Sequence, residues 1–190
     1  MGDKRYREIL ERAARLIYRH GYEATSMQDI AESCGLTKAG LYHHIRTKEA
    51  LLLAIMDYGM DLFEEMVLAK VGDIADPVAR LRECMARNLA LVTHDPSKEV
   101  TIILHEHQTL TGAAQRQINA RKKRYVRFLE GSFREAIDRG QIRAVDPKIA
   151  AFSFLGTVLW TYKWYRADGA ITPRRLSDGM IDLFFDGLRR

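Results

Sequence analysis

The chain has 190 residues and a formal net charge of +5, and 47% of its residues are hydrophobic. This length allows one small domain and one larger domain, and the basic balance suits a polyanionic partner. Two cysteines, at positions 34 and 84, are too few for a disulfide framework or a zinc knuckle. The N-terminal stretch is charged and lacks the apolar segment of a secretory signal, so a cytoplasmic protein is expected.

Helical signals follow one another along the whole chain, and no stretch alternates as a strand would. Each of the four prolines directly follows Asp or Thr, which predicts that it opens a helix behind an N-cap residue. The expected long helices span 3–20, 48–70, 77–94, 96–109, 112–139, 147–167 and 173–188, with two short helices inside 27–46. The fold class is therefore all-α, with about nine helices, and the turn at 72–76 is the expected hinge.

The segment 25–52 has the pattern of two short helices joined by a tight turn. Ser26 is a good N-cap residue, and Asp29 three positions later makes a capping box. Ile30 and Ala31 then lie on one apolar helix face, and Gly35 stands where a left-handed residue ends a helix. These signals predict a helix that starts at residue 27 and a turn at Gly35.

The second short helix is expected to show most of its surface to solvent. Thr37 caps it, and Leu41 and Ile45, one turn apart, hold it to the core by a single edge. Small residues beside a cation, a phenol and an imidazole suit close approach to base edges in the major groove, while Lys48 at the next helix start can pair with phosphate. His44 is expected to pack against the first helix. The candidate DNA-contacting residues are Ser26, Thr37, Lys38, Ala39, Gly40, Tyr42, His43 and Lys48.

The segment 21–52 resembles the DNA-binding domain of the TetR family of transcriptional regulators. The match runs along Gly21, Thr25, Ile30, Ala31, Gly35, Leu36, Lys38, Leu41, Tyr42, His43, Lys48 and Leu51. Ile45 departs from the pattern, because the family usually has phenylalanine there; the change alters core volume and no DNA contact. The resemblance implies a helix-turn-helix domain at 1–50, a helical ligand-binding and dimerisation domain at 51–190, and a homodimeric repressor on a palindromic operator in double-stranded DNA.

The stretch 147–166 is the most apolar part of the chain, with hydrophobic residues almost all round the expected helix. Its uncharged run is shorter than the roughly 20 residues that cross a bilayer, so no membrane contact is expected. A helix that is hydrophobic all round must be covered all round. Burial against a second subunit is the expected explanation, with the last two helices of each chain forming a four-helix dimer interface.

Aromatic and cationic residues gather at the end of that apolar stretch. The run WTYKWYRADGAITP is similar to the corresponding segment of TetR-family regulators of fatty-acid, steroid or aromatic acyl-CoA catabolism. The similarity implies a small hydrophobic effector, with a fatty or aromatic acyl-CoA as the candidate, that releases the repressor from DNA. Aromatic residues at helical spacing are more often plain core or interface. The candidate ligand-binding residues are Phe154, Trp160, Lys163, Trp164, Arg166 and His105.

No catalytic set is present: the sequence has no nucleophile elbow, phosphate loop or HExxH motif. We therefore expect no enzyme activity and no cofactor. His105 and His107 are two positions apart, so on a helix they diverge, and no metal site is expected there. Two alternatives stay open: a TetR-like regulator that responds to a hydrophobic drug or a metal, and a small-molecule-binding enzyme with a vestigial DNA module.

Overall fold

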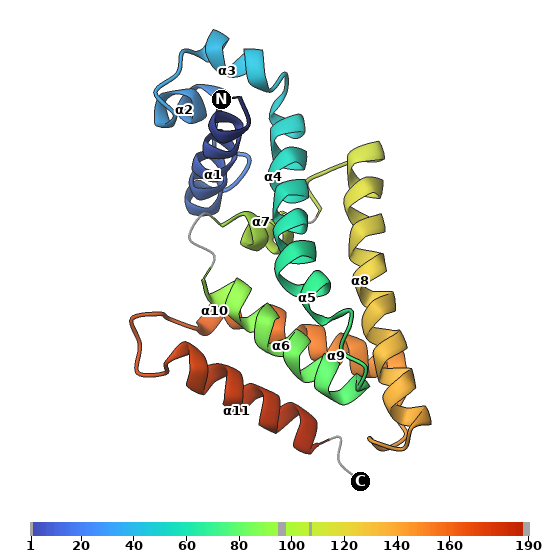
Figure 1. The fold of residues 1–190 in the computed structure, drawn as a ribbon. Coiled ribbons are helices and arrows are strands. Elements are labelled where there is room, and N and C mark those ends of the chain that lie inside the picture. Colours follow the sequence, from blue (N-terminus) through green and yellow to red (C-terminus); the bar gives the residue numbers. More distant parts are fainter. Residues whose placement is uncertain (1, 95–97, 107, 188–190) are drawn as a thin grey trace. The chain divides into compact units, whose positions relative to one another are not determined.

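The computed structural model describes residues 2–94, 98–106 and 108–187, and its regular elements are all helices (Figure 1). The expected all-α class is confirmed, since no strand occurs within the described residues. If α4, η1 and α5 are counted as one helix and α10 as the end of α9, these residues form nine helices. No helix in the described ranges is both long and apolar enough to cross a bilayer.

The chain folds into two compact units, each made of two separate segments. The first unit comprises Met1–Leu62 and Asp95–Asn119, and the second comprises Phe63–His94 and Ala120–Arg190. Two helices, α4 (Lys48–Phe63) and α8 (Gly112–Asp138), run through the boundary. The expected domain division at residues 50 and 51 stays a prediction.

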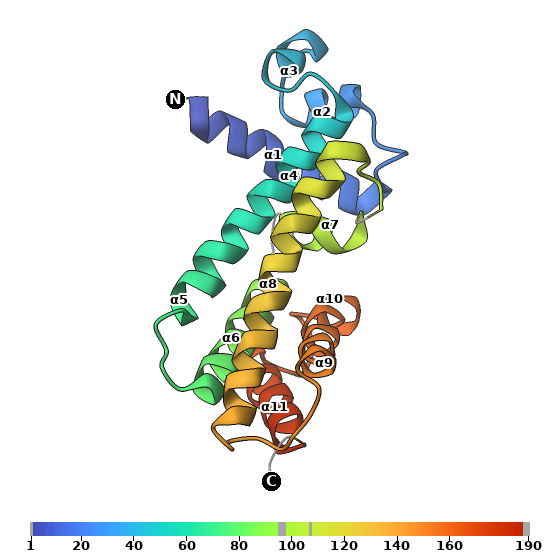
Figure 2. The same cartoon turned by 90° about the vertical axis from the view of Figure 1, so that its right-hand side faces the viewer.

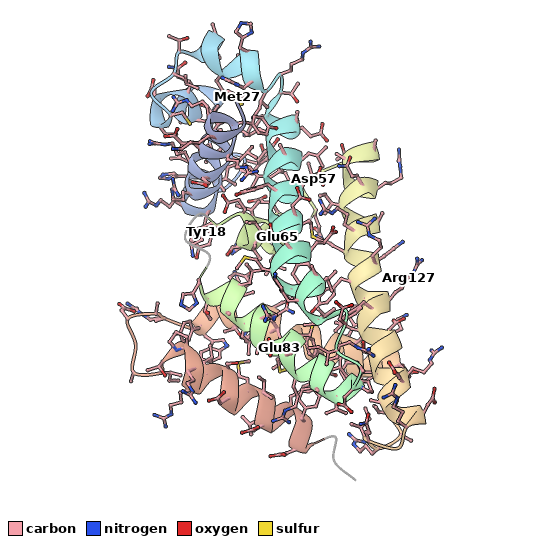
Figure 3. All side chains as sticks on the ribbon, in the orientation of Figure 1. Tyr18, Met27, Asp57, Glu65, Glu83 and Arg127 are labelled. Atoms are coloured by element: carbon pink, nitrogen blue, oxygen red, sulfur yellow. The ribbon has the colours of Figure 1, made fainter. Side chains whose placement is uncertain are left out.

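The first unit is built on the amphipathic helix α1 (Gly2–His20), whose inward residues Ile9 and Ala13 are fully buried. Two short helices, α2 (Met27–Ser33) and α3 (Lys38–His44), and α4 up to residue 62 contribute to its core. Met27, labelled in Figure 3, is buried at the start of α2. The core of this unit therefore forms from one apolar face of each helix, as the 3.6-residue periodicity predicts.

A further short helix, α7 (Glu99–His105), belongs to the first unit although it follows α6 in the chain. It packs against α1 (Figure 1), where the ring of Tyr18 meets that of His105 edge-on at 5.6 Å. The sequence predicted a helix from residue 96, whereas α7 begins at Glu99; Pro96 itself lies outside the described residues.

α7 also approaches α4 closely, and a glycine permits this. A Cβ atom at Gly59 would lie 2.9 Å from the carbonyl oxygen of Glu99 and 2.9 Å from Cδ1 of Ile103. Real Cβ atoms do not approach a backbone oxygen so closely without a shift of the backbone. Residue 59 therefore sets how near α4 and α7 can come.

The second unit contains α6 (Pro77–Thr93), most of α8, α9 (Pro147–Leu159), α10 (Thr161–Trp164) and α11 (Pro173–Asp186). α6 packs against α9, α10 and α11, and Figure 2 shows the same group of helices from a second side. Arg127 points away from α8 into solvent (Figure 3). The core of this unit holds Phe133 and Phe154, both fully buried.

Three prolines begin helices as predicted. Pro77, Pro147 and Pro173 are the first residues of α6, α9 and α11. The residue before each accepts a backbone N–H from the first turn: Asp76 from Ala79 at 2.7 Å, Asp146 from Lys148 at 2.8 Å, and Thr172 from Arg175 at 3.2 Å. The local signals in the sequence therefore placed these three helix starts correctly.

The long helix expected at 48–70 is continuous but contains a π-helical turn, η1 (Glu64–Leu68), before α5 (Ala69–Val71). The Glu64 carboxylate accepts bonds from Arg121 Nε at 3.0 Å and from Arg124 Nη2 at 3.2 Å, both on α8. The helix expected at 147–167 is instead interrupted, because α9 ends at Leu159 and α10 begins at Thr161.

The turn expected to act as a hinge, residues 72–76, is tied to other parts of the second unit. Arg80 donates to the carbonyl of Ile74 at 3.2 Å, and Arg139 donates to that of Ala75 at 3.2 Å. The same two arginines share the carboxylate of Glu135 on α8. The turn is thus held by charge-assisted bonds, which are stronger than neutral ones.

One polar cluster lies in the core of the second unit. Asn88 Nδ2 donates to the hydroxyl of Tyr125 at 2.9 Å and to the carbonyl of Cys84 at 2.7 Å. All three residues are buried, and burial raises the pKa of the Cys84 thiol to about 11. The thiol is therefore protonated and unreactive at neutral pH. The amide nitrogen of Asn88 and the hydroxyl of Tyr125 are hydrogen-bonded inside the core, as is usual for buried polar groups.

Gly59→Ala tests the close contact between α4 and α7. Alanine gains about 1 kcal/mol of helix propensity, but overpacking costs about 1–3 kcal/mol, so we expect a net loss of unfolding free energy. Gly131→Ala on the exposed side of α8 is the matched control, because its Cβ would meet nothing within 4 Å; it should stabilise by up to about 1 kcal/mol. Urea denaturation measures both, and equal gains would contradict the contact.

Candidate functional site

The first short helix of the first unit, α2, starts at the capping box that the sequence predicts. The Ser26 hydroxyl accepts from the amide of Asp29 at 3.1 Å, and the Asp29 carboxylate accepts from the amide of Ser26 at 2.8 Å. Bonds from the backbone and then from the hydroxyl of Ser26 lower the pKa of Asp29. The helix start is therefore closed by a charged group at neutral pH.

The turn that follows α2 has the geometry expected of Gly35, which takes φ +65°. The amide of Leu36 bonds back to the carbonyl of Ala31 at 2.9 Å, and that of Gly35 bonds to Glu32 at 3.0 Å. This pair of bonds is the Schellman arrangement. It ends α2, and the chain then continues to the start of α3.

α3 is held by one edge and exposes the rest, as the sequence predicts. Thr37 Oγ1 accepts from the amide of Gly40 at 3.0 Å, and Leu41 and Ile45 are buried against the core. A Cβ at Gly40 would lie 3.2 Å from that same Thr37 oxygen, so glycine leaves the cap undisturbed. The exposed candidates on this helix are Lys38, Ala39, Tyr42 and His43.

Lys48 is placed differently from the other candidates. Its Nζ donates to the carbonyl of Glu23 at 3.2 Å and lies 4.3 Å from the centre of the Tyr22 ring. The ammonium group is therefore held against the loop before α2. Ser26, a candidate for DNA contact, is exposed while its hydroxyl serves the capping box.

One expectation about the histidines is wrong. His44 was expected to pack against α1, but it is exposed, beside His43. Arg46, which the sequence reasoning did not single out, is exposed as well. α3 ends at His44, and Ile45 is already extended, so these side chains point outward. The sequence prediction treated residues 37–46 as one continuous helix, and for this reason it gave His44 the wrong direction.

The candidate ligand-binding residues do not gather in one place. Phe154 is fully buried between Phe133, at 6.2 Å between ring centroids, and Phe184, at 5.8 Å. Trp160 is 64% exposed and Trp164 is 46% exposed. Their assignment to the ligand stays a prediction.

The charged and imidazole candidates are also separate. Lys163 lies over the ring of its neighbour Tyr162 at 5.0 Å. Arg166 pairs with the carboxylate of Asp168 at 3.2 Å, which raises the pKa of Arg166. His105 belongs to the first unit. No group of three or more metal-binding side chains occurs among the described residues, and His107 of the histidine pair lies outside them.

Several of the exposed hydrophobic residues of the second unit lie on α9 and α11. One side of α9, here called the α9 face, exposes a stripe at helical spacing: Ile149, Phe152, Ser153, Gly156 and Trp160. Leu183 on α11 is 81% exposed. A groove of about 640 Å³ runs between these helices, lined by Ile149, Trp164 and Leu183 among others, with Arg143 as its cation. Single exposed hydrophobic residues are ordinary, but a contiguous patch marks an interaction surface.

The capped helix α2, the glycine turn and the exposed α3 together define a helix-turn-helix protein whose second helix can enter a DNA groove. Residues 9–55 match the family of bacterial regulatory proteins of the TetR type, and residues 75–188 match the C-terminal domain of tetracycline-repressor-like proteins. The chain belongs to the TetR family of transcriptional regulators. The resemblance in its N-terminal sequence is confirmed.

Three similar proteins carry functional names. AibR, solved in complex with isovaleryl coenzyme A and operator DNA, is 62% identical with a TM-score of 0.92, over 94% of this chain and 97% of that one. The transcriptional repressor KstR2 of Rhodococcus jostii (strain RHA1) is 28% identical over 95% of this chain and 89% of its own length. The fatty acid metabolism regulator of Bacillus subtilis (strain 168) is 24% identical over 97% and 95%.

Alanine substitutions separate base reading from phosphate binding on α3 and α4. We expect Lys38→Ala and His43→Ala to cost about 1–3 kcal/mol on the operator and to lower the preference for it over random DNA. Tyr42→Ala and Lys48→Ala should weaken binding to both DNAs alike. Fluorescence anisotropy on both duplexes measures this, and equal losses for all four variants would contradict the assignment of base contacts.

Proposed function

We propose that this protein is a ligand-responsive repressor that binds a palindromic operator as a homodimer and is released by a small hydrophobic effector. The observation that carries the proposal is α3, which is fixed by Leu41 and Ile45 and exposes Lys38, Tyr42 and His43. It acts by binding DNA and not by catalysis, in the cytoplasm where its DNA lies. Residues 1–50 form the DNA-binding domain and residues 51–190 bind the effector and the second subunit.

The α9 face supports the homodimer. Ile149 and Phe152 are each more than half exposed, and Leu183 on the neighbouring helix is more exposed still. Burying apolar surface gains roughly 25 cal/mol per Å², and two helices from each subunit make a four-helix interface. In a twofold dimer the reading helices contact half-sites about 34–36 Å apart, so the operator is a palindrome.

An acyl-CoA is the effector class that the relatives favour. AibR is similar over nearly its whole length, and its structure holds isovaleryl coenzyme A. In this chain we assign the effector contacts to the exposed end of α9 and to α10, where Trp160, Lys163 and Trp164 lie. The assignments of Phe154, Arg166 and His105 to the ligand stay predictions. An aromatic surface with adjacent cations suits an apolar acyl group joined to phosphates.

Release is proposed as a change of affinity. The AibR structure contains both isovaleryl coenzyme A and operator DNA, so in that protein the two are found in one complex. We propose that effector and operator DNA can bind this protein together in the same way. The effector then shifts the protein toward a conformer that binds DNA less tightly. The free energy of coupling between the two sites is about 1–3 kcal/mol, or roughly 5- to 150-fold in affinity. By linkage, operator DNA then weakens effector binding by the same factor.

Binding of the purified protein to its own promoter DNA tests the function. Electrophoretic shift is measured with isovaleryl-CoA, medium- and long-chain acyl-CoAs and aromatic acyl-CoAs, each beside its free acid. We expect specific binding that one acyl-CoA weakens at least about fivefold while its acid does not. Unchanged operator affinity at saturating acyl-CoA would contradict the effector, and binding without preference for the promoter would contradict the repressor.

Leu183→Asp tests the dimer. Because Leu183 is 81% exposed, the change should leave the fold of one chain intact, whereas a buried unpaired charge at the interface should separate the subunits. Light scattering after gel filtration is expected to give twice the 21.8 kDa of one chain for the natural sequence and about that single mass for the variant. Met66→Asp is the control, because Met66 is also exposed, at 48%, but lies on η1 and outside the proposed interface; its mass should stay that of the dimer. If Leu183→Asp also keeps the mass of the dimer, the interface lies elsewhere.

A further inference from the structure

The C-terminal end of α2 has carbonyl groups that its own turn does not use. In the Schellman arrangement the amides of Leu36 and Gly35 take the carbonyls of Ala31 and Glu32. The next two carbonyls, those of Ser33 and Cys34, lie beyond these bonds. A helix end leaves such acceptors for side chains, water or ligands.

Two arginines of α1 bind these two carbonyls. Arg12 Nη1 donates to the carbonyl of Ser33 at 2.6 Å, and Arg5 Nη2 donates to that of Cys34 at 2.7 Å. The partners are 21 and 29 residues apart in the chain. Cations at a helix C-terminus also interact favourably with the helix dipole. The end of α2 is therefore fixed to α1 by two short charge-assisted bonds.

Glu8 lies between the two arginines and orients both. Its carboxylate accepts from Arg5 Nη1 at 2.7 Å and from Arg12 Nη2 at 3.1 Å. Positions 5, 8 and 12 share one face of a helix, because three and four residues make about one turn. The hydrogen bond from Arg5, with that from Arg12, lowers the pKa of Glu8, so the carboxylate is charged at neutral pH. Each guanidinium thus donates from one nitrogen to Glu8 and from another to a backbone carbonyl at the end of α2.

We propose that Arg5, Glu8 and Arg12, here called the α1 clamp, are positioning residues for DNA reading. The end of α2 leads through Gly35 and Leu36 directly to Thr37, the cap of α3. A shift of the end of α2 therefore moves the start of α3, whose N-terminal turn approaches the bases. The role rests on the proposed operator binding by α3 and adds three residues that do not touch DNA.

Glu8→Gln distinguishes the clamp from general electrostatics by the sign of its effect. The substitution removes a negative charge, so long-range attraction alone would tighten binding to any DNA. Loss of the carboxylate instead frees both arginines, and the clamp role requires operator affinity to fall by about threefold to tenfold while affinity for random DNA does not fall. Both arginines remain, and far-UV circular dichroism with a urea midpoint confirms that the variant is folded.

Arg12→Met distinguishes positioning from direct phosphate contact. If Arg12 contacted phosphate, the slope of log affinity against log salt would become shallower by about 0.9. As a clamp residue it should lower operator affinity about tenfold with an unchanged slope. Arg19→Met is the matched control, because Arg19 is an exposed arginine in the last turn of the same helix and its loss should barely change the operator preference.

The measurement is fluorescence anisotropy of the full-length protein on operator and random duplexes at several salt concentrations. Weaker operator binding by Glu8→Gln, with the slope kept in Arg12→Met, is the expected result. Operator binding by Glu8→Gln as tight as in the natural protein, or a shallower slope for Arg12→Met, would overturn the clamp alone. A natural protein without operator preference would overturn the proposed function and the clamp together.

Discussion

Helix α3 is attached to the first unit by the burial of two side chains, Leu41 and Ile45. Its ability to contact DNA depends on this small buried area. A seven-residue helix is not stable by itself, because nucleation costs more than so few bonds return. Burial of each side chain contributes about 1.5–3 kcal/mol, and the Thr37 cap adds about 1 kcal/mol. Since only one edge is needed for attachment, the remaining surface is free to carry polar residues for DNA.

So small an attachment leaves the orientation of α3 sensitive to what precedes it. The capping box closes the start of α2, and the glycine turn bonds fix its exit. The arginines of α1 then bind the carbonyls that remain at the end of α2. Backbone polar groups that are buried away from water need hydrogen-bond partners. Here two of these partners, Arg5 and Arg12, come from α1, which is itself packed into the core.

The second unit differs from the first because α9 carries hydrophobic side chains on its outward side as well as on its inward side. Phe133, Phe154 and Phe184 contact one another inside it, which satisfies the inward side of α9. The outward side keeps Ile149, Phe152 and Trp160 in solvent. An amphipathic helix can be recognised from its periodicity, but a helix that is hydrophobic all round tells only that something must cover it. The exposed stripe is the side that we propose a second subunit covers.

Local signals in the sequence determined most of the fold. The caps at Ser26, Thr37 and Asp76, the turn at Gly35 and the prolines act on residues within one turn of themselves, so the sequence alone located those helix ends and the exposed face of α3. Only the tertiary structure decided the π-turn at 64–68, the break after Leu159 and the outward position of His44. It also decided that α7 joins the first unit and that Arg5 and Arg12 bind α2. These features depend on contacts between residues far apart in the chain, whose pairing no local pattern encodes.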